Sequence, residues 1–141
     1  MNLVDANVLI YAVNRSDRRH SVARDWLDHE LYAGESIGFA WQVLLAFLRL
    51  TTRPGLFPNP LDPEDAIAVV AGWLEAPRAV LVHPTPDHLN ILAGLLSRTG
   101  TGANLTSDAH LAALALEHRA TVRTYDSDFG RFPGVRFAEP A

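Results

Sequence analysis

Short apolar segments alternate with longer segments of helical character along the whole chain, and this order restricts the fold more than any other feature. Residues 2–5, 36–40, 79–82, 122–125 and 135–137 have the short, apolar character of buried strands. The segments expected to be helical are residues 6–13, 20–32, 41–51, 63–75, about 86–99, and a helix around Asp108 that Thr106 caps. This order predicts an α/β fold with three layers, α/β/α, around a central, mostly parallel sheet of about five strands.

The composition is typical of one globular domain spanning residues 1–141, with 48% hydrophobic residues and no internal repeat. The chain has no cysteine and all 12 of its basic residues are arginine, which excludes disulfides, thiolate zinc sites and catalysis by lysine. A net charge of −4 is unusual for a protein that coats nucleic acid, but it is compatible with an enzyme that reaches phosphates through a bound cation. The amino terminus lacks the basic region of a signal peptide, and no apolar run approaches the ~18 residues of a membrane span, so we expect a cytoplasmic protein.

Four aspartates stand where an expected strand ends or an expected helix begins. Asp5 follows the first strand, Asp108 lies in the first turn of its helix, and Asp126 and Asp128 follow the strand that ends near residue 125. In a parallel sheet, ligands bind in the crevice at the carboxyl ends of the strands. Carboxylates gathered there repel one another unless a cation is present, and oxygen ligands of this kind suit Mg²⁺ or Mn²⁺. The pattern therefore predicts a divalent metal site and chemistry on phosphate.

Each of these aspartates also has a purely structural interpretation. Asp5 is well placed to cap the helix that follows it, and Asp108 to complement a helix dipole. Asp126 and Asp128 are common turn residues. The structural interpretation is weaker for the set than for any one member, because all four would have to fall at strand–helix junctions by coincidence.

The chain resembles the PIN-domain nucleases, and within them the VapC-type toxins of type II toxin–antitoxin operons. The resemblance is carried by LVDANVLIY at residues 3–11, FLR at 47–49, LTSDAHLAALA at 105–115 and TYDSDF at 124–129. It implies an α/β/α endoribonuclease that depends on Mg²⁺ or Mn²⁺ and cleaves RNA, usually transfer or ribosomal RNA, with a metal-activated water. It also implies a homodimer that a cognate VapB-type antitoxin holds inactive.

On the matching positions, the resemblance assigns metal binding to Asp5, Asp108 and Asp126, and an accessory catalytic role to Asp128. Further candidates follow from the residues around these acids. Thr106 and Asn7 are candidates to contact substrate or a bound water, and Arg49 to contact an RNA phosphate.

One departure from the family concerns the helix at residues 41–51, where the family usually has a glutamate and this chain has Ala46. Gln42 and Arg49 share a helix face with Ala46, and that face is expected to look into the acidic crevice. Gln42 or a water could then replace the missing ligand. Alternatively, Gln42 caps the helix and Arg49 pairs with a carboxylate, Asp5 being one candidate.

The missing glutamate leaves a second hypothesis, a catalytically weak module that acts with its antitoxin on operator DNA. For the antitoxin, an acidic crevice predicts insertion of a basic side chain, because a guanidinium pairs well with carboxylates. The rest of the antitoxin is expected on apolar surface near Trp26, Leu27 and Trp41. His110 is expected on another side of its helix from Asp108. The arginines at 15, 18 and 19 are either a solvated loop or a contact to RNA.

Overall fold

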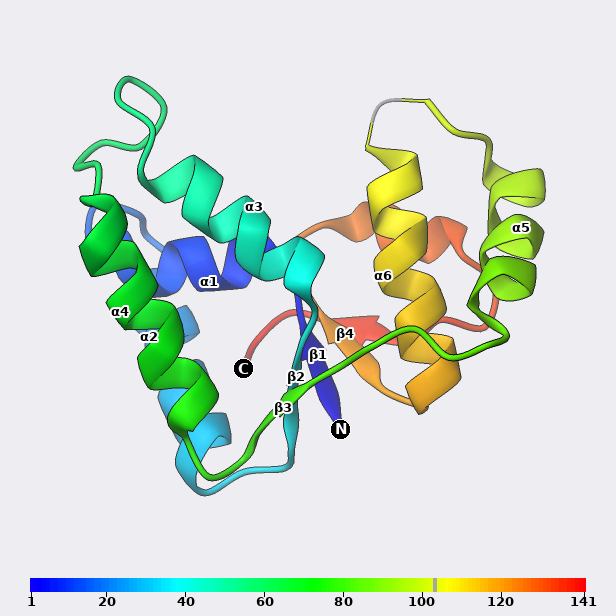
Figure 1. Ribbon diagram of the computed structural model, residues 1–141, viewed down its shortest axis with the longest axis horizontal. Helices are drawn as coiled ribbons and strands as arrows, with labels where there is room; N and C mark the ends of the chain where they lie inside the picture. The colour runs from blue at the N-terminus through cyan, green and yellow to red at the C-terminus, as the bar shows by residue number, and fades with distance from the viewer. Residues whose placement is uncertain (103) are drawn as a thin grey trace.

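The computed structural model describes residues 1–102 and 104–141 and shows an α/β fold with five strands (Figure 1). The elements in chain order are β1 (Asn2–Val4), α1 (Ala6–Val13), α2 (His20–Tyr32), β2 (Ile37–Phe39), α3 (Trp41–Thr51), α4 (Pro63–Glu75), β3 (Ala79–Leu81), α5 (His88–Thr99), α6 (Leu105–His118), β4 (Thr121–Arg123), the 3₁₀ helix η1 (Ser127–Arg131) and β5 (Phe137–Ala138).

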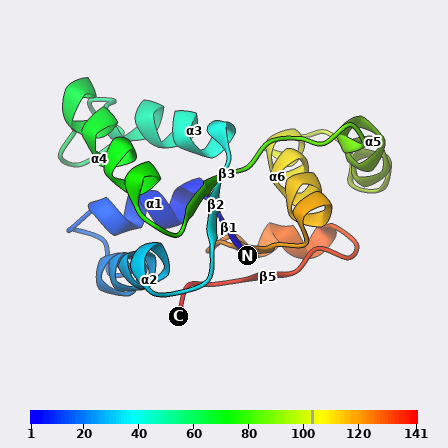
Figure 2. The same cartoon turned by 60° about the horizontal axis from the view of Figure 1, so that its bottom comes forward.

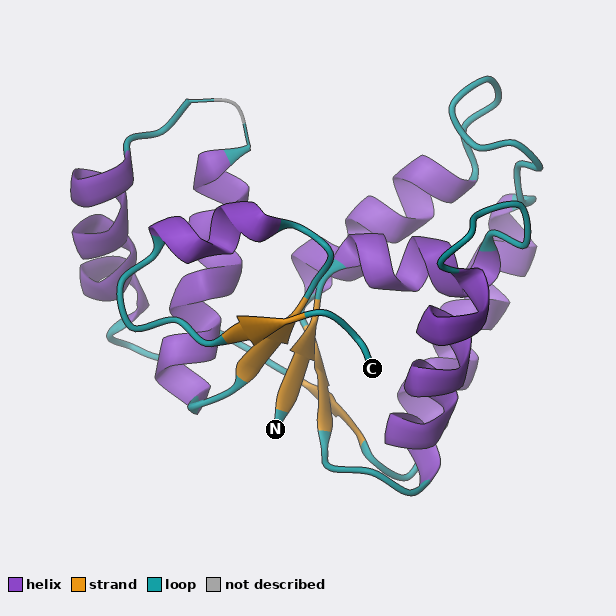
Figure 3. Ribbon diagram, turned by 180° about the vertical axis from the view of Figure 1, so that it is seen from behind, coloured by secondary structure: helices purple, strands orange, loops and turns teal. Residues whose placement is uncertain are grey.

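The strands form one sheet in the order β3-β2-β1-β4-β5, and every pairing in it is parallel. Helices α1 to α4 lie on one side of the sheet and α5 and α6 on the other (Figure 2). The predicted three-layer α/β/α fold is therefore confirmed. Because all strands run the same way, their carboxyl ends meet at one edge, which Figure 3 shows as the edge with the arrowheads. Any side chain that directly follows a strand is brought to this edge.

The core explains why β1 and β2 occupy the middle of the sheet. Every residue of both strands is buried, and Leu3, Ile37 and Phe39 are fully enclosed. Fully burying such a side chain stabilises the fold by about 1.5–3 kcal/mol. Helix α6 packs closely through six buried residues, four of which are alanines. These short side chains let the helix that carries Asp108 lie near the strands.

Most expected helices are found where the sequence predicts them, and the differences lie at element ends. The helices expected at residues 20–32, 41–51 and 63–75 have these bounds, and the last begins with Pro63 at its first position. The last strand is Phe137–Ala138 rather than 135–137, because only these residues pair with β4. Among the described residues, no helix combines the length and the apolar character needed to cross a membrane.

The prediction that Thr106 caps the helix of Asp108 is wrong. The helix begins at Leu105, and Asn104 holds the cap position, from which its carbonyl accepts the Asp108 N–H at 2.9 Å. Thr106 lies inside the first turn, and its hydroxyl donates to the Thr101 carbonyl at 3.4 Å. Asparagine and threonine both favour the cap position, so the residue types alone do not decide between them.

Candidate active site

A cavity of about 430 Å³ opens at the carboxyl edge of the sheet, between α3 and α6. Asp5 from the β1–α1 junction and Asp108 from the first turns of α6 both line it. These residues are 103 positions apart in the sequence, and the parallel sheet brings them together. The structure thus places two of the four predicted acids in one cavity.

Asp5 is both a helix cap and a member of this cavity. Its side chain accepts a hydrogen bond from the Ala6 N–H at 2.7 Å, which caps α1. Its other oxygen, Oδ2, accepts from the Thr124 hydroxyl at 2.7 Å and from Asn7 Nδ2 at 3.3 Å. The structural interpretation of Asp5 is therefore correct, and the same bonds hold the carboxylate in a fixed orientation at the cavity.

Thr124 connects this arrangement to the second acidic segment. Its hydroxyl oxygen accepts hydrogen bonds from the Asp126 N–H at 3.0 Å and from Asn7 Nδ2 at 3.1 Å, while its proton goes to Asp5. The residue is almost wholly buried, at 1% exposure. One hydroxyl therefore fixes the position of Asp5 relative to the backbone of Asp126. Thr124 was not among the predicted site residues, although its place between β4 and Asp126 is a signal that could have found it.

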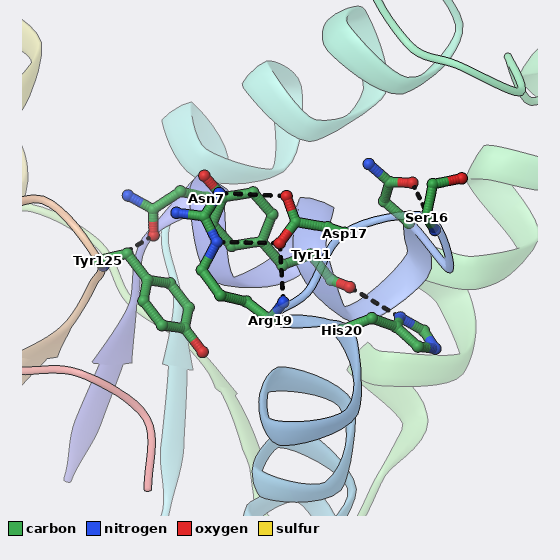
Figure 4. A network of polar contacts seen from close by, with 8 residues as sticks. Asn7, Tyr11, Ser16, Asp17, Arg19, His20 and Tyr125 are labelled. Atoms are coloured by element: carbon green, nitrogen blue, oxygen red, sulfur yellow. Dashed lines mark hydrogen bonds and ion pairs between the residues drawn. The ribbon is translucent and has the colours of Figure 1, made fainter.

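Asn7, in the first turn of α1, makes the corresponding contacts from that helix. Its Oδ1 accepts the Tyr125 N–H at 3.1 Å, so α1 is tied to the segment that follows β4 (Figure 4). With both ends of its amide engaged by Asp5, Thr124 and Tyr125, Asn7 positions the acidic segments. Its predicted contact with substrate stays a prediction.

Asp126 and Asp128 have the structural roles that were expected of turn residues. Asp126 caps η1, accepting the Asp128 N–H at 2.8 Å, and it lines a separate depression of about 90 Å³ beside Thr124. Asp128 is exposed and lies 3.8 Å from Arg131, a distance and exposure at which an ion pair contributes little. Neither residue lines the larger cavity that Asp5 and Asp108 share.

The charges of the other three acids nevertheless act on Asp108. The pKa of Asp108 is raised to about 6, mainly by burial, then by the negative charge of Asp5, and further by those of Asp126 and Asp128. Burial likewise raises the pKa of Asp5, against the lowering effect of its hydrogen bonds. The neighbouring carboxylates thus make Asp108 harder to ionise, and a nearby cation would relieve this repulsion.

These residues fit a hard divalent ion that keeps part of its water shell. Within residues 1–102 and 104–141, no three Asp, Glu or His side chains are gathered tightly enough to hold an ion between them. Mg²⁺ commonly binds through only one or two carboxylates and retains several waters. Asp5 and Asp108, with Asp126 close enough to repel them, supply oxygen donors and negative charge of the right kind.

Helix α3 forms the opposite wall of the cavity and contains no acidic residue. Gln42, Ala46 and Arg49 line the cavity from this helix. The alternative in which Gln42 caps the helix is wrong, because the cap position belongs to Ala40. The alternative in which Arg49 pairs with a carboxylate is also wrong: among the described residues, Arg49 forms no ion pair.

A hydrogen-bonded chain on the other side of α6 was not predicted. His110 points away from Asp108, as expected, and its Nδ1 lies 2.9 Å from His88 Nε2. His88 Nδ1 in turn contacts Glu117 Oε2 at 2.5 Å, and Glu117 Oε1 accepts from the N–H and the hydroxyl of Thr85. The Glu117 side chain is 1% exposed. This chain fastens α5 to α6, so it supports the helix that carries Asp108.

Of the arginines before α2, Arg15 and Arg18 are exposed, whereas Arg19 fits neither interpretation offered for this stretch. Arg19 is held by Asp17 through bonds of 2.9 and 3.1 Å, and its guanidinium lies 3.8 Å from the ring centre of Tyr11 (Figure 4). Tyr11 also packs edge-on against Tyr125, with ring centres 5.2 Å apart. Arg19 is therefore a structural residue of the α1–α2 connection.

The apolar surface expected for the antitoxin is only partly present. Trp26 and Leu27 are 7% and 2% exposed and belong to the core, so their prediction as surface is wrong. Both fall on the buried face of α2, which packs against α1. Trp41, at the start of α3, is 46% exposed and remains available.

Comparison with known proteins places this geometry in a family. The model of the PIN domain matches residues 3–135. The chain is 59% identical to Ribonuclease VapC37 of Mycobacterium tuberculosis over 140 residues, which cover 99% of this chain and 97% of the relative. It is 36% identical to Ribonuclease VapC33 of the same species, covering 99% of this chain and 98% of the relative. The chain therefore belongs to the PIN-domain family, in its VapC-type branch.

Solved structures show the same fold at lower sequence identity. The chain matches Mycobacterium tuberculosis VapC20, described as a sarcin–ricin loop cleaving toxin, with a TM-score of 0.69 and 21% identity, covering 96% of this chain and 99% of that one. It matches a chain of VapBC2 from Rickettsia felis, bound to a DNA fragment from the promoter, with a TM-score of 0.72 and 16% identity, covering 98% and 97%.

Proposed function

We propose that this protein is the toxin of a type II toxin–antitoxin pair, a metal-dependent endoribonuclease that hydrolyses RNA phosphodiester bonds. The observation that carries the proposal is the convergence of Asp5 and Asp108 in one cavity, where burial and then the charges of Asp5 and of two further aspartates raise the pKa of Asp108. Such a group of carboxylates costs stability in the absence of a cation, and clusters of perturbed acids in a cavity are typical of catalytic sites.

The chain's own residues would divide the work as follows. Asp5 and Asp108 would hold Mg²⁺ or Mn²⁺ directly, Asp126 would reach the ion through one of its waters, and Asp128 would assist by its charge. The ion, when bound, supplies activation of a water and neutralisation of charge on the phosphoryl oxygens. Thr124 keeps Asp5 and the Asp126 backbone in register. The cavity between α3 and α6 receives the RNA strand.

The RNA class follows from the shape of the site and from the relatives. A cavity flanked by two helices accepts a single strand with exposed bases more readily than a duplex, and proteins usually read RNA in loops. VapC20 is described as cleaving the sarcin–ricin loop. A loop of transfer or ribosomal RNA is the substrate we propose for this chain.

The proposed partner is a VapB-type antitoxin, and we propose a homodimer as the toxin's own assembly. The support for the partner is that similar folds occur in VapBC complexes and that the cavity is acidic. We expect a basic side chain of the antitoxin among Asp5, Asp108 and Asp126. Neutralising that basic residue in the antitoxin should weaken inhibition, and unchanged inhibition would count against this mode.

Ala46 supports a second candidate, a catalytically weak module that acts with its antitoxin on operator DNA. The two candidates separate on expression of the toxin alone. The wild type should arrest growth, whereas Asp5→Asn and Asp108→Asn should not. Asp25→Asn is a matched control, because Asp25 is 70% exposed on α2 and lines no part of the cavity. If all four proteins leave growth unchanged while the antitoxin complex binds operator DNA, the second candidate is the correct one.

A further inference from the structure

Arg49 is the only cationic side chain that lines the acidic cavity, as far as the described residues go. It lies in the last turn of α3 and is exposed. It shares the cavity with Asp5 and Asp108, yet it forms no ion pair or side-chain hydrogen bond with any described residue. An arginine that faces carboxylates across a cavity without pairing with them is free to bind an anion that enters between the two walls.

No residue of α3 carries a negative charge that could pair with the Arg49 guanidinium. The helix WQVLLAFLRLT has no acidic residue, and the positions one and two turns before Arg49 on the same face are Leu45 and Trp41. Both are exposed, at 58% and 46%. Gln42, Leu45 and Ala46 line the cavity from the same helix, so Arg49 is the one charged side chain on this wall among the described residues. The opposite wall carries the carboxylates, so the cavity has an acidic side and a cationic side.

We propose that Arg49 binds a phosphate of the RNA strand and so positions the strand across the acidic site. This inference rests on the proposed ribonuclease function and adds a substrate contact to it. A guanidinium presents a planar fork of donors that matches two phosphate oxygens, and it stays charged at every physiological pH. The phosphate it holds would be one beside the bond that is cleaved, because the cleaved phosphate itself belongs next to Asp5 and Asp108.

The geometry also bears on the missing glutamate. Ala46 lies one turn before Arg49 on α3, and both line the cavity. A glutamate at position 46 would be close enough to pair with the arginine, as oppositely charged residues three apart on a helix do. With alanine there, Arg49 has no such partner on its own helix and stays available to the substrate.

The test compares Arg49→Gln, Arg49→Lys and the control Arg78→Gln. Arg78 is exposed and stands just before β3, at the edge of the sheet away from the cavity, so both glutamine variants change the net charge equally. We would measure kcat and KM on a single-stranded RNA, together with RNA binding at several salt concentrations in the absence of divalent ions. Thermal unfolding of each variant would show that it is folded.

Arg49→Gln should raise KM by about tenfold to a hundredfold, the usual effect of losing a hydrogen bond to a charged group, with a much smaller change in kcat. The slope of log K against log salt should fall by about 0.7, as expected for one lost phosphate contact on a single strand. Arg49→Lys should fall between wild type and Arg49→Gln, and Arg78→Gln should match the wild type.

Three results would overturn the inference. One is an Arg49→Gln enzyme with the KM and salt slope of the wild type. Another is an equal effect of Arg78→Gln, which would indicate only a loss of overall charge. The third is an Arg49→Gln enzyme that binds RNA normally and loses only its affinity for the antitoxin, which would assign the residue to the protein partner. If the wild type itself cuts no RNA, the proposed function fails, and that result is distinct from these three.

Discussion

Thr124→Val removes one hydroxyl and tests whether the site is held together as described. Valine keeps the branched shape of threonine, so the packing of this 1% exposed side chain changes little. What is lost is a bond to the Asp5 carboxylate at 2.7 Å and the acceptor of the Asp126 N–H at 3.0 Å and of Asn7 at 3.1 Å. A hydrogen bond to a charged group contributes about 1.5–3 kcal/mol, and a buried donor left unpaired costs about 1–3 kcal/mol.

We therefore expect the free energy of unfolding of Thr124→Val to fall by about 2–4 kcal/mol, since the lost bonds share one oxygen and are not additive. Urea unfolding followed by circular dichroism measures this change, with an unchanged m-value as evidence that the denatured state is the same. The pKa of Asp5 should rise further, because the Thr124 hydroxyl is the largest of the effects that lower it. RNA cleavage should fall as well.

Thr124→Ser is the matched control, because it keeps the hydroxyl and loses only a methyl group. It should retain most of the cleavage activity and more stability than the valine variant. If Thr124→Val unfolds within about 0.5 kcal/mol of the wild type, a change typical of an unimportant surface position, the hydroxyl does not hold the site together. The reasoning from the hydrogen bonds would then be refuted.

Four further predictions concern the supports and the charge of the site. His88→Ala leaves the Glu117 carboxylate, which is 1% exposed, without its imidazole partner, so urea unfolding should show a loss of about 3 kcal/mol; a loss near zero would contradict the support role. The hydrogen bonds of Thr85 and His88 lower the pKa of Glu117, so their contribution should be present above about pH 4.5 and lost as the pH falls below it, in a titration of stability. For Asp108 the sign is opposite, because its pKa is raised to about 6. Without divalent ions, its contribution to stability should decrease as the pH rises from about 4 to about 6. Asp108→Asn should abolish this decrease. Ala46→Glu should tighten Mg²⁺ or Mn²⁺ binding about tenfold, equivalent to about 1.4 kcal/mol, as measured by calorimetry. An unchanged affinity would mean that position 46 of α3 does not contact the ion.

The sequence was sufficient to predict the layers, the helices and the parallel sheet, because these depend on local patterns. A buried strand such as Leu3-Val4 needs a short apolar run, and an amphipathic helix such as α2 needs periodic apolar positions, and both are visible in the order of residues. The edge at which Asp5 and Asp108 meet then follows from parallel strands.

Contacts between distant segments were not visible in the same way. The bond from Thr124 to Asp5 joins residues 119 positions apart, and the chain from His110 through His88 to Glu117 joins two helices whose relative rotation no local pattern fixes. The burial of Trp26 likewise depends on which face of α2 meets the rest of the fold. These details are set by packing between elements, so no local pattern of residues predicts them.

The chemistry of the RNA ends that the purified protein produces with Mg²⁺ or Mn²⁺ decides whether the acidic cavity acts through a metal-activated water. Water attack at phosphorus, supported by Asp5, Asp108 and Asp126, leaves a 5′-phosphate and a 3′-hydroxyl. We predict these ends for the wild type, with no cleavage by Asp5→Asn or Asp108→Asn or in the presence of a chelator. A 2′,3′-cyclic phosphate, or cleavage that persists in the chelator, would contradict the proposed role of the acidic cavity.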